Sequence, residues 1–185
     1  MEPQTIKECE AKMQKAISAL AKELGKVRTG RASLALLDDI RVDYYGTPSP
    51  LNQVATLSVP ESRLIVIQPW DPSLIGAIEK AILKSELGMT PANDGKVIRI
   101  TIPRLTEERR KELVKLIKKM GENSKIGVRN IRREIIETLR TMEKDKEISE
   151  DELHHLQEQV QKTTDTFVGQ IDEVIAEKEK ETMEI

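Results

Sequence analysis

The sequence predicts an α+β protein: an elongated three-helix bundle with a hinged, small β/α/β domain inserted into it. Apolar residues recur every three or four positions over residues 2–29, from 106 to about 142, and from 149 to 174, which is typical of helices with one apolar face. Seven of the eight prolines lie between the first two of these segments, where period-two alternation replaces the helical pattern. Because no such helix can bury its apolar face alone, the three favour one bundle.

The first helix is expected over residues 2–29. One narrow apolar face consists of Ile6, Cys9, Met13, Ala16/Ile17, Leu20, Leu24 and Val27. We expect Thr29-Gly30 to end this helix, since glycine tolerates the left-handed conformation at a helix C-terminus.

Strands are expected in the middle of the chain. "IRVDYYGTP" indicates a strand and a turn, and three further strands are expected in "VATLSV", "RLIVIQP" and "KVIRITI". Between them, Asp71-Pro72 favours the start of a helix that Gly88 follows, because Asp caps well and Pro fits the first turn. "NDG" at 93–95 indicates a turn before the last strand.

Two further helices follow. Thr106 can cap the second, whose apolar face is Leu113, Ile117, Met120, Ser124, Val128, Ile131, Ile135, Leu139 and Met142. Ser149 and Glu152 have the spacing of a capping box and open the third. Its apolar face is Leu153, Leu156, Val160, Thr163/Thr164, Phe167, Ile171 and Val174.

These elements predict two domains, with residues 1–30 and 105–185 forming the bundle and residues 31–104 the inserted domain. Two short crossings join them, and paired crossings are a common way to build a hinge. The predicted hinge residues are Thr29, Gly30, Pro103, Arg104, Leu105 and Thr106.

Charge is divided unevenly along the chain. Residues 109–133 hold ten Lys or Arg and two Glu, whereas residues 149–185 hold eleven acidic residues and three lysines. A basic stripe on one helix face is expected of a protein that binds a phosphate backbone. It consists of Lys111, Lys115, Lys118, Lys125, Arg129 and Arg132. The alternative is that the acidic third helix neutralises the stripe within the bundle.

The cluster Arg129, Arg132 and Arg133 is the strongest candidate site, with Glu134 and Glu137 as its only near acids. Residues at i, i+3 and i+4 share a helix face, and arginine favours bidentate phosphate contacts. No aromatic residue lies near 125–135 to stack on bases. We therefore expect folded RNA, held through phosphates and shape, near the far end of the bundle.

Other residues are expected to be structural. Cys9, the only cysteine, lies on the first apolar face and is expected to pack in the core, and Trp70 is expected to pack in the small domain. His154 and His155 face different directions without a third ligand, so no metal is expected. "RTGRAS" around Gly30 lacks the glycines and lysine of a phosphate loop. The sequence thus predicts no enzyme, no cofactor and no membrane segment, in a reducing cytoplasmic compartment.

Three stretches resemble the bacterial ribosome recycling factor family: "VRTGRASLALLDDIRVDYYGTPSPLNQVATLSVPESRLIVIQPWD", "NDGKVIRITIPRLTEERRKELVK" and "VRNIRREI". The resemblance implies an L-shaped, transfer-RNA-sized monomer. It implies a factor that binds the post-termination ribosome, against large-subunit RNA near the peptidyl transferase region. With elongation factor G and GTP hydrolysis by that partner, the subunits would separate and mRNA and tRNA would be released.

The resemblance also bears on single residues. Arg129 and Arg132 match the family's RNA-contacting arginines, with Arg28 and Arg31 flanking the hinge, and Lys125 and Arg133 complete the predicted RNA-binding set. Two other classes of function stay open: a coiled-coil adaptor acting through the acidic third helix, and an enzyme with its active site in the small domain. Binding through phosphates should weaken steeply with salt, whereas an apolar helix contact should not.

Overall fold

The computed structural model describes residues 4–184, and contacts within the chain divide it into two compact units. The helical unit runs to Leu24 and resumes over Lys111–Lys180. The sheet unit comprises Gly25–Arg110 and the residues from Glu181 onward. Residues 25–30 and 105–110 therefore group with the sheet unit, and the predicted pivots near residues 30 and 105 stay predictions.

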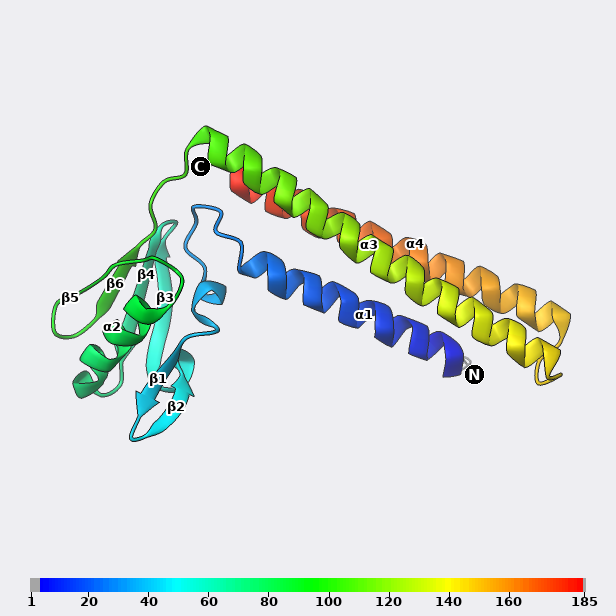
Figure 1. The fold of residues 1–185 in the computed structure, drawn as a ribbon, viewed down its shortest axis with the longest axis horizontal. Helices are drawn as coiled ribbons and strands as arrows, with labels where there is room; N and C mark the ends of the chain where they lie inside the picture. Colours follow the sequence, from blue (N-terminus) through cyan, green and yellow to red (C-terminus); the bar gives the residue numbers. More distant parts are fainter. Residues whose placement is uncertain (1–3, 185) are drawn as a thin grey trace. The chain divides into compact units, whose positions relative to one another are not determined.

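Three long helices lie side by side in the helical unit: α1 (Gln4–Gly25), α3 (Glu107–Lys144) and α4 (Glu150–Met183) (Figure 1). Lys12 Nζ lies 3.9 Å from Glu134 Oε2, which pairs α1 with α3. Lys118 pairs with Glu179 of α4 at 3.9 Å, so α3 also runs beside α4. The predicted three-helix bundle and α+β class are confirmed.

The predicted apolar faces are largely the buried ones. Six predicted α1 residues are buried: Ile6, Cys9, Met13, Ile17, Leu20 and Leu24. On α3, Leu113, Ile117, Val128, Ile135 and Leu139 are buried as predicted, and so is Gly121, which the pattern did not include. A Cβ at Gly121 would lie 2.6 Å from Ile175 Cγ1, so α3 leaves no room there for a larger side chain against α4.

The predicted end of the first helix at Thr29-Gly30 is wrong, because α1 ends at Gly25. Its predicted start at residue 2 lies outside the described residues. The residues after Gly25 are held by the sheet unit instead: Lys26 Nζ lies 3.0 Å from Asp39 Oδ2, and Arg28 Nη2 donates to the Glu86 carbonyl at 2.7 Å. Tertiary contacts thus override local helical tendency. Gly30 has a φ of 81°, in the left-handed region expected of it.

The predicted caps of α3 and α4 are confirmed. The Arg109 backbone N–H donates to Thr106 Oγ1 at 3.2 Å. At the start of α4, the Ser149 N–H donates to Glu152 Oε2 at 2.8 Å and the Glu152 N–H donates to Ser149 Oγ at 3.2 Å. This is a reciprocal capping box, and its hydrogen bonds lower the pKa of Glu152.

The sheet unit has an antiparallel hairpin and a four-stranded sheet, in the order β3-β4-β6-β5. The strands are β1 (Arg41–Tyr44), β2 (Thr47–Pro50), β3 (Ala55–Glu61), β4 (Leu64–Pro69), β5 (Pro91–Asn93) and β6 (Ile98–Thr101). β2 and β5 were not predicted. Both contain proline, and both are edge strands, where proline is tolerated. Short 3-10 helices lie at Leu34–Leu37, Leu51–Gln53 and Pro72–Leu74.

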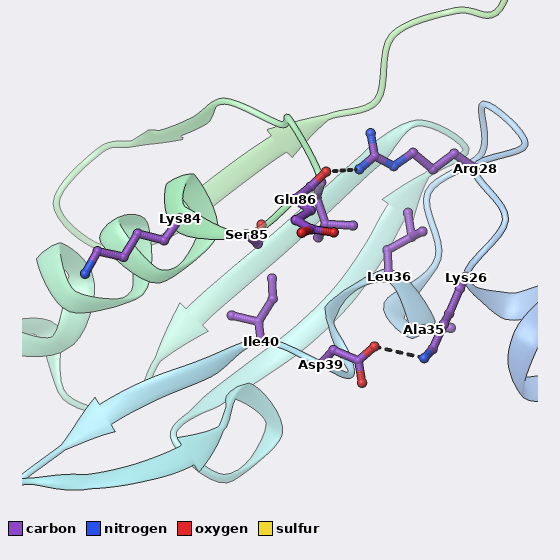
Figure 2. A pocket seen from close by; sticks show the side chains of 10 residues that line it. Lys26, Arg28, Ala35, Leu36, Asp39, Ile40, Lys84, Ser85 and Glu86 are labelled. Atoms are coloured by element: carbon purple, nitrogen blue, oxygen red, sulfur yellow. Dashed lines mark hydrogen bonds and ion pairs between the residues drawn. The ribbon is translucent and has the colours of Figure 1, made fainter.

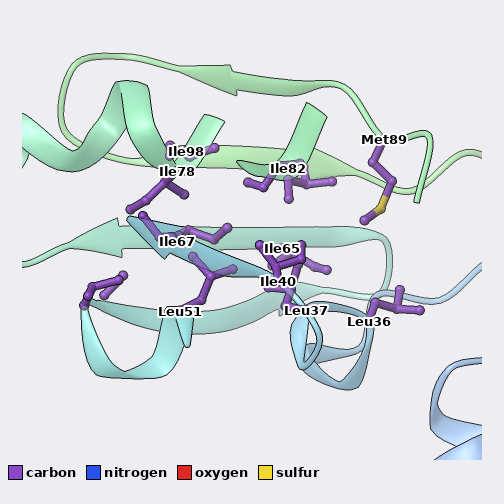
Figure 3. Packing of buried hydrophobic residues seen from close by; sticks show 14 of the residues in the cluster. Leu36, Leu37, Ile40, Leu51, Ile65, Ile67, Ile78, Ile82, Met89 and Ile98 are labelled. Carbon is purple, nitrogen blue, oxygen red and sulfur yellow. The ribbon is translucent and has the colours of Figure 1, made fainter. Parts of the chain in front are cut away.

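Helix α2 (Ile75–Lys84) covers one face of the four-stranded sheet (Figure 1). Figure 3 shows Ile78 and Ile82 of α2 directed at the sheet isoleucines, and each of these side chains is fully buried. The facing sheet residues are Ile65, Ile67, Ile98 and Ile100. The aliphatic core follows from strand alternation, because every second residue of β4 and β6 points at α2.

The predicted packing of Trp70 in the small domain is wrong, because this side chain is 66% exposed. Ile65, Ile67 and Pro69 take the buried positions of β4, so Trp70 falls on the opposite face of the sheet by strand alternation. Its Nε1 donates to Thr56 Oγ1 at 3.0 Å. The core is filled with isoleucines, and the tryptophan is left on the surface.

Candidate RNA interface

The arginine cluster lies on the solvent side of α3, in its second half. Arg133 lies eleven residues before Lys144, so the cluster is about 17 Å short of the helix end. The cluster therefore lies toward the far end of α3, as expected, but not at the end itself. The cluster lies along the side of the rod, three turns before the connection to α4.

The three arginines differ in how they are held. The Arg129 side chain is 48% exposed, and its Nη1 lies 3.6 Å from Glu122 Oε1. Arg132 Nη1 donates to Gln161 Oε1 of α4 at 2.9 Å, and its buried Nε lacks a partner among residues 4–184. Arg133 is exposed and has no ion pair within the described part of the chain. The site therefore offers one guanidinium group without an ion pair, one in an exposed pair with Glu122, and one that is oriented by α4.

Glu122 is a near acid that the sequence reasoning missed. It lies seven residues before Arg129, two helical turns away and on the same face, so helical geometry could have included it. Exposed pairs of this kind contribute little to stability. Solvent or a competing anion can therefore replace Glu122 as the partner of the Arg129 guanidinium group.

Among the predicted RNA-binding residues of α3, Lys125 is the one most engaged in ion pairs within the bundle. Its side chain is only 19% exposed, and its Nζ lies 2.5 Å from Asp172 Oδ1 and 3.8 Å from Glu122 Oε2. Lys118 likewise pairs with Glu179. Part of the basic stripe is thus neutralised by the acidic α4, as the alternative interpretation expected. Among the three arginines of the cluster, Arg129 is paired with Glu122, whereas Arg133 has no ion pair within residues 4–184.

Arg28 and Arg31 belong to the sheet unit. Arg28 lines a cavity of about 490 Å³ that also contains Lys26, Asp39 and Glu86 (Figure 2). Arg31 Nη2 lies 3.7 Å from Glu184 Oε2, and its side chain is 38% exposed. The neighbouring Thr29 is buried, and its hydroxyl donates to Glu181 Oε1 at 3.1 Å.

The structure brings several predicted hinge residues together with these two arginines. Gly30, Pro103 and Leu105 line a second cavity, of about 220 Å³, with Arg28 and Arg31. Thr106 serves as the cap of α3 instead. The two chain crossings therefore meet within the sheet unit.

Other candidate chemistry is sparse. Residues 4–184 contain no group of three His, Cys, Asp or Glu side chains arranged to hold a metal ion. Cys9 is fully buried, and burial raises the pKa of its thiol to about 11. In the same part of the chain, none of the helices combines the length and hydropathy that a bilayer crossing requires.

The family model described as "Ribosome recycling factor" matches residues 20–183 of this chain. The chain belongs to the ribosome recycling factor family. Among curated relatives, the ribosome-recycling factor of Desulfatibacillum aliphaticivorans is 61% identical over 177 residues, 96% of each chain. That of Syntrophus aciditrophicus (strain SB) is 57% identical over the full length of both chains.

Solved structures of ribosome recycling factors agree with the fold. A solution structure of the factor matches with a TM-score of 0.80 and 45% identity, covering 100% of both chains. A second match, with a TM-score of 0.69 and 42% identity, covers 97% of both. It is described as models of the T. thermophilus ribosome recycling factor and the E. coli elongation factor G bound to the E. coli post-termination complex. The ribosome recycling factor resemblance thus extends over both units.

Proposed function

We propose that this chain is a ribosome recycling factor in function: it binds the post-termination ribosome in the cytoplasm and acts with elongation factor G. The observation that carries the proposal is the match of both units, over nearly the whole chain, to a factor bound to a post-termination complex together with that GTPase. Separation of the subunits, with release of mRNA and tRNA, is the proposed outcome.

In this proposal the helical unit supplies the RNA contact. Arg129 and Arg133 are exposed guanidinium groups that can each take a phosphate in a bidentate contact. Arg132 presents a third group whose position is fixed by Gln161. Large-subunit rRNA near the peptidyl transferase region is the proposed surface. Lys125 supports the site, since it joins α3 to α4 through Asp172.

The sheet unit is the proposed second body, joined through the hinge. Gly30, with its φ of 81°, is the hinge residue whose conformation depends most on residue type. GTP hydrolysis belongs to elongation factor G. The chain itself, acting as a monomer, couples binding to separation mechanically and catalyses no reaction.

The proposal is tested by ribosome pelleting with three single variants: Arg129→Ala, Arg132→Ala and Arg133→Ala. Each loses a charge-assisted phosphate contact worth about 1–3 kcal/mol, so each should bind large subunits more weakly by about fivefold or more and with a shallower salt dependence. Splitting of post-termination complexes by elongation factor G and GTP should fall in parallel, as measured by light scattering.

Two controls separate RNA contact from fold. Arg140→Ala removes another exposed arginine of α3, outside the cluster, and should bind normally. Gln161→Ala removes the internal partner of Arg132 while keeping the arginine. If Arg140→Ala weakens binding as much as the cluster variants do, general charge rather than this site binds the ribosome. Wild-type affinity in all three cluster variants would refute the interface.

A further inference from the structure

Three of the four aromatic side chains of this protein lie on the surface of the sheet unit. Tyr44 is 41% exposed, Tyr45 is 80% exposed and Trp70 is 66% exposed, whereas Phe167 is buried. The chain has one tryptophan, two tyrosines and one phenylalanine in 185 residues. Aromatic side chains have the largest apolar area to bury, so their concentration on a surface marks a binding region.

The two tyrosines are held out by the turn between β1 and β2. Tyr45 has a φ of 50° and Gly46 a φ of 82°, the pair of positive angles found in a type I′ turn. A bulky residue rarely adopts a positive φ, and Asn or Gly would fit there without cost. The Gly46 N–H donates to Asp43 Oδ1 at 2.7 Å, which fixes the turn. The rings of Tyr44 and Tyr45 meet edge to face, 4.7 Å apart.

Asp71 connects the tyrosines to the tryptophan. The Tyr45 hydroxyl donates to Asp71 Oδ2 at 3.4 Å, and Asp71 directly follows Trp70 in the chain. Asp71 Oδ1 accepts the Ser73 N–H at 2.9 Å. This hydrogen bond lowers the pKa of Asp71, so the carboxylate stays ionised at neutral pH.

The charge around these rings distinguishes between partners. Two carboxylates accept hydrogen bonds from this region: Asp71 from the Tyr45 hydroxyl and Asp43 from the Gly46 N–H. Carboxylates repel a phosphate backbone, so base stacking on these rings is disfavoured. They attract a cation, and a lysine or arginine also gains from lying over a tyrosine or tryptophan face. Tryptophan, tyrosine and arginine are also the residues that dominate protein interfaces.

We propose that Asp43, Tyr44, Tyr45, Trp70 and Asp71, the aromatic patch, form a docking surface for an arginine- or lysine-bearing segment of a protein partner. The patch lies in the sheet unit and uses none of the residues assigned to RNA. It therefore gives this protein a second recognition surface, of opposite charge to the first.

The sole tryptophan makes the test direct, because intrinsic fluorescence reports on the patch alone. The intact protein is titrated with a synthetic peptide of Gly-Arg repeats, a matched peptide of Gly-Glu repeats, and a single-stranded uridine oligonucleotide. We expect a saturable fluorescence change with the Gly-Arg peptide, at least about tenfold tighter than with the other two probes. No ribosome is present, so the result does not depend on the proposed function.

Variants separate charge from shape. Asp43→Asn with Asp71→Asn removes both charges and keeps one acceptor oxygen at each position, and should weaken Gly-Arg binding about 5–10-fold. Tyr45→Ala should weaken it by a similar factor, whereas Leu83→Ala, which truncates a 63% exposed side chain of α2, should not. Circular dichroism checks that each variant is folded. Tighter binding of the oligonucleotide, an unchanged affinity in the charge variant, or no saturable change with Gly-Arg would each overturn the proposal.

Discussion

The two units of this protein use different interactions between their elements. In the helical unit, ion pairs such as Lys12–Glu134 and Lys125–Asp172 cross between helices, beside one apolar face on each helix. In the sheet unit, α2 and the sheet meet through a dense cluster of buried aliphatic residues. Charge on the helical unit therefore has a structural use, besides the RNA contact proposed for it. The exposed aromatic residues of the sheet unit lie outside that cluster.

This difference shows where function can be sought on each surface. On α3, a basic residue must first be checked for a partner on α4 before it is assigned to RNA. Lys125 has such a partner, whereas Arg133 has none within residues 4–184. On the sheet unit, the candidates for a binding role are the aromatic residues that are exposed and not part of the aliphatic core.

The largest expected effect comes from truncating the sheet-unit core. Ile78 is fully buried between α2 and the sheet, so Ile78→Ala should lower the free energy of unfolding of that unit by about 2–5 kcal/mol. Because α1, α3 and α4 bury other residues, helicity by circular dichroism should persist while amide protection of β4 and β6 falls. Leu139→Ala, at a fully buried α3 position, is the matched variant for the helical unit. Simultaneous loss in both units from either variant would show that they unfold as one.

Two glycines of α3 test how closely the helices pack. A Cβ at Gly121 would lie 2.6 Å from Ile175 Cγ1 and 2.9 Å from its Cδ1, so Gly121→Ala should destabilise the helical unit by about 1–3 kcal/mol. Gly127 has nothing within 4 Å of such a Cβ, so Gly127→Ala should stabilise α3 by about 0.5–1 kcal/mol. Urea denaturation of the two variants measures both. The same sign of change in both would mean that helix propensity, not packing, dominates at Gly121.

The smallest expected effect is the pH dependence at Asp94, in the turn between β5 and β6. Its carboxylate accepts N–H groups from Val97 at 2.9 Å and Lys96 at 3.0 Å and contacts Arg99 Nη1 at 2.8 Å, and these bonds lower its pKa. A lowered folded pKa gives stability that is present above the ordinary value of 3.8 and is lost as pH falls through the lower folded value.

Asp94→Asn keeps an acceptor for the turn but removes the charge. The amide protection of β6 between pH 5 and pH 2 should therefore depend less on pH in this variant than in the wild type. The difference between the two proteins should be small because the carboxylate is exposed. High salt should leave most of the difference in place, since the main acceptor bonds are to the backbone. Identical pH profiles would assign the acid sensitivity to other carboxylates.

Much of this architecture could be predicted from the sequence, because helical and strand periodicities report which residues are buried. The buried positions of α1 and α3 and the capping box at Ser149 follow directly from spacing. On α4, the predicted Phe167 and Ile171 are buried, but Ile175 is buried in place of the predicted Val174. The end of α1 could not, because Lys26 and Arg28 are held by Asp39 and by the Glu86 carbonyl, far away in sequence. Likewise, the burial of Gly121 depends on Ile175 of another helix.

The residues of the candidate site could be predicted, but not the side chains with which they are paired. Arg129 and Arg132 could be found from their spacing, yet only the structure shows that Arg132 is hydrogen-bonded to Gln161. For Trp70 a usable signal existed. Its position alternates with Ile65, Ile67 and Pro69, so strand parity places it on the outer face despite its apolar side chain.

The burial of Cys9 has a practical consequence. With a pKa of about 11 and no exposure to solvent, this thiol is almost entirely protonated and shielded at neutral pH. Maleimides and alkylating reagents will therefore react first with any cysteine introduced on the surface. Fluorophore pairs can therefore be attached to introduced cysteines without replacing Cys9. The slow rate at which Cys9 itself is alkylated measures how often α1 separates from the other helices.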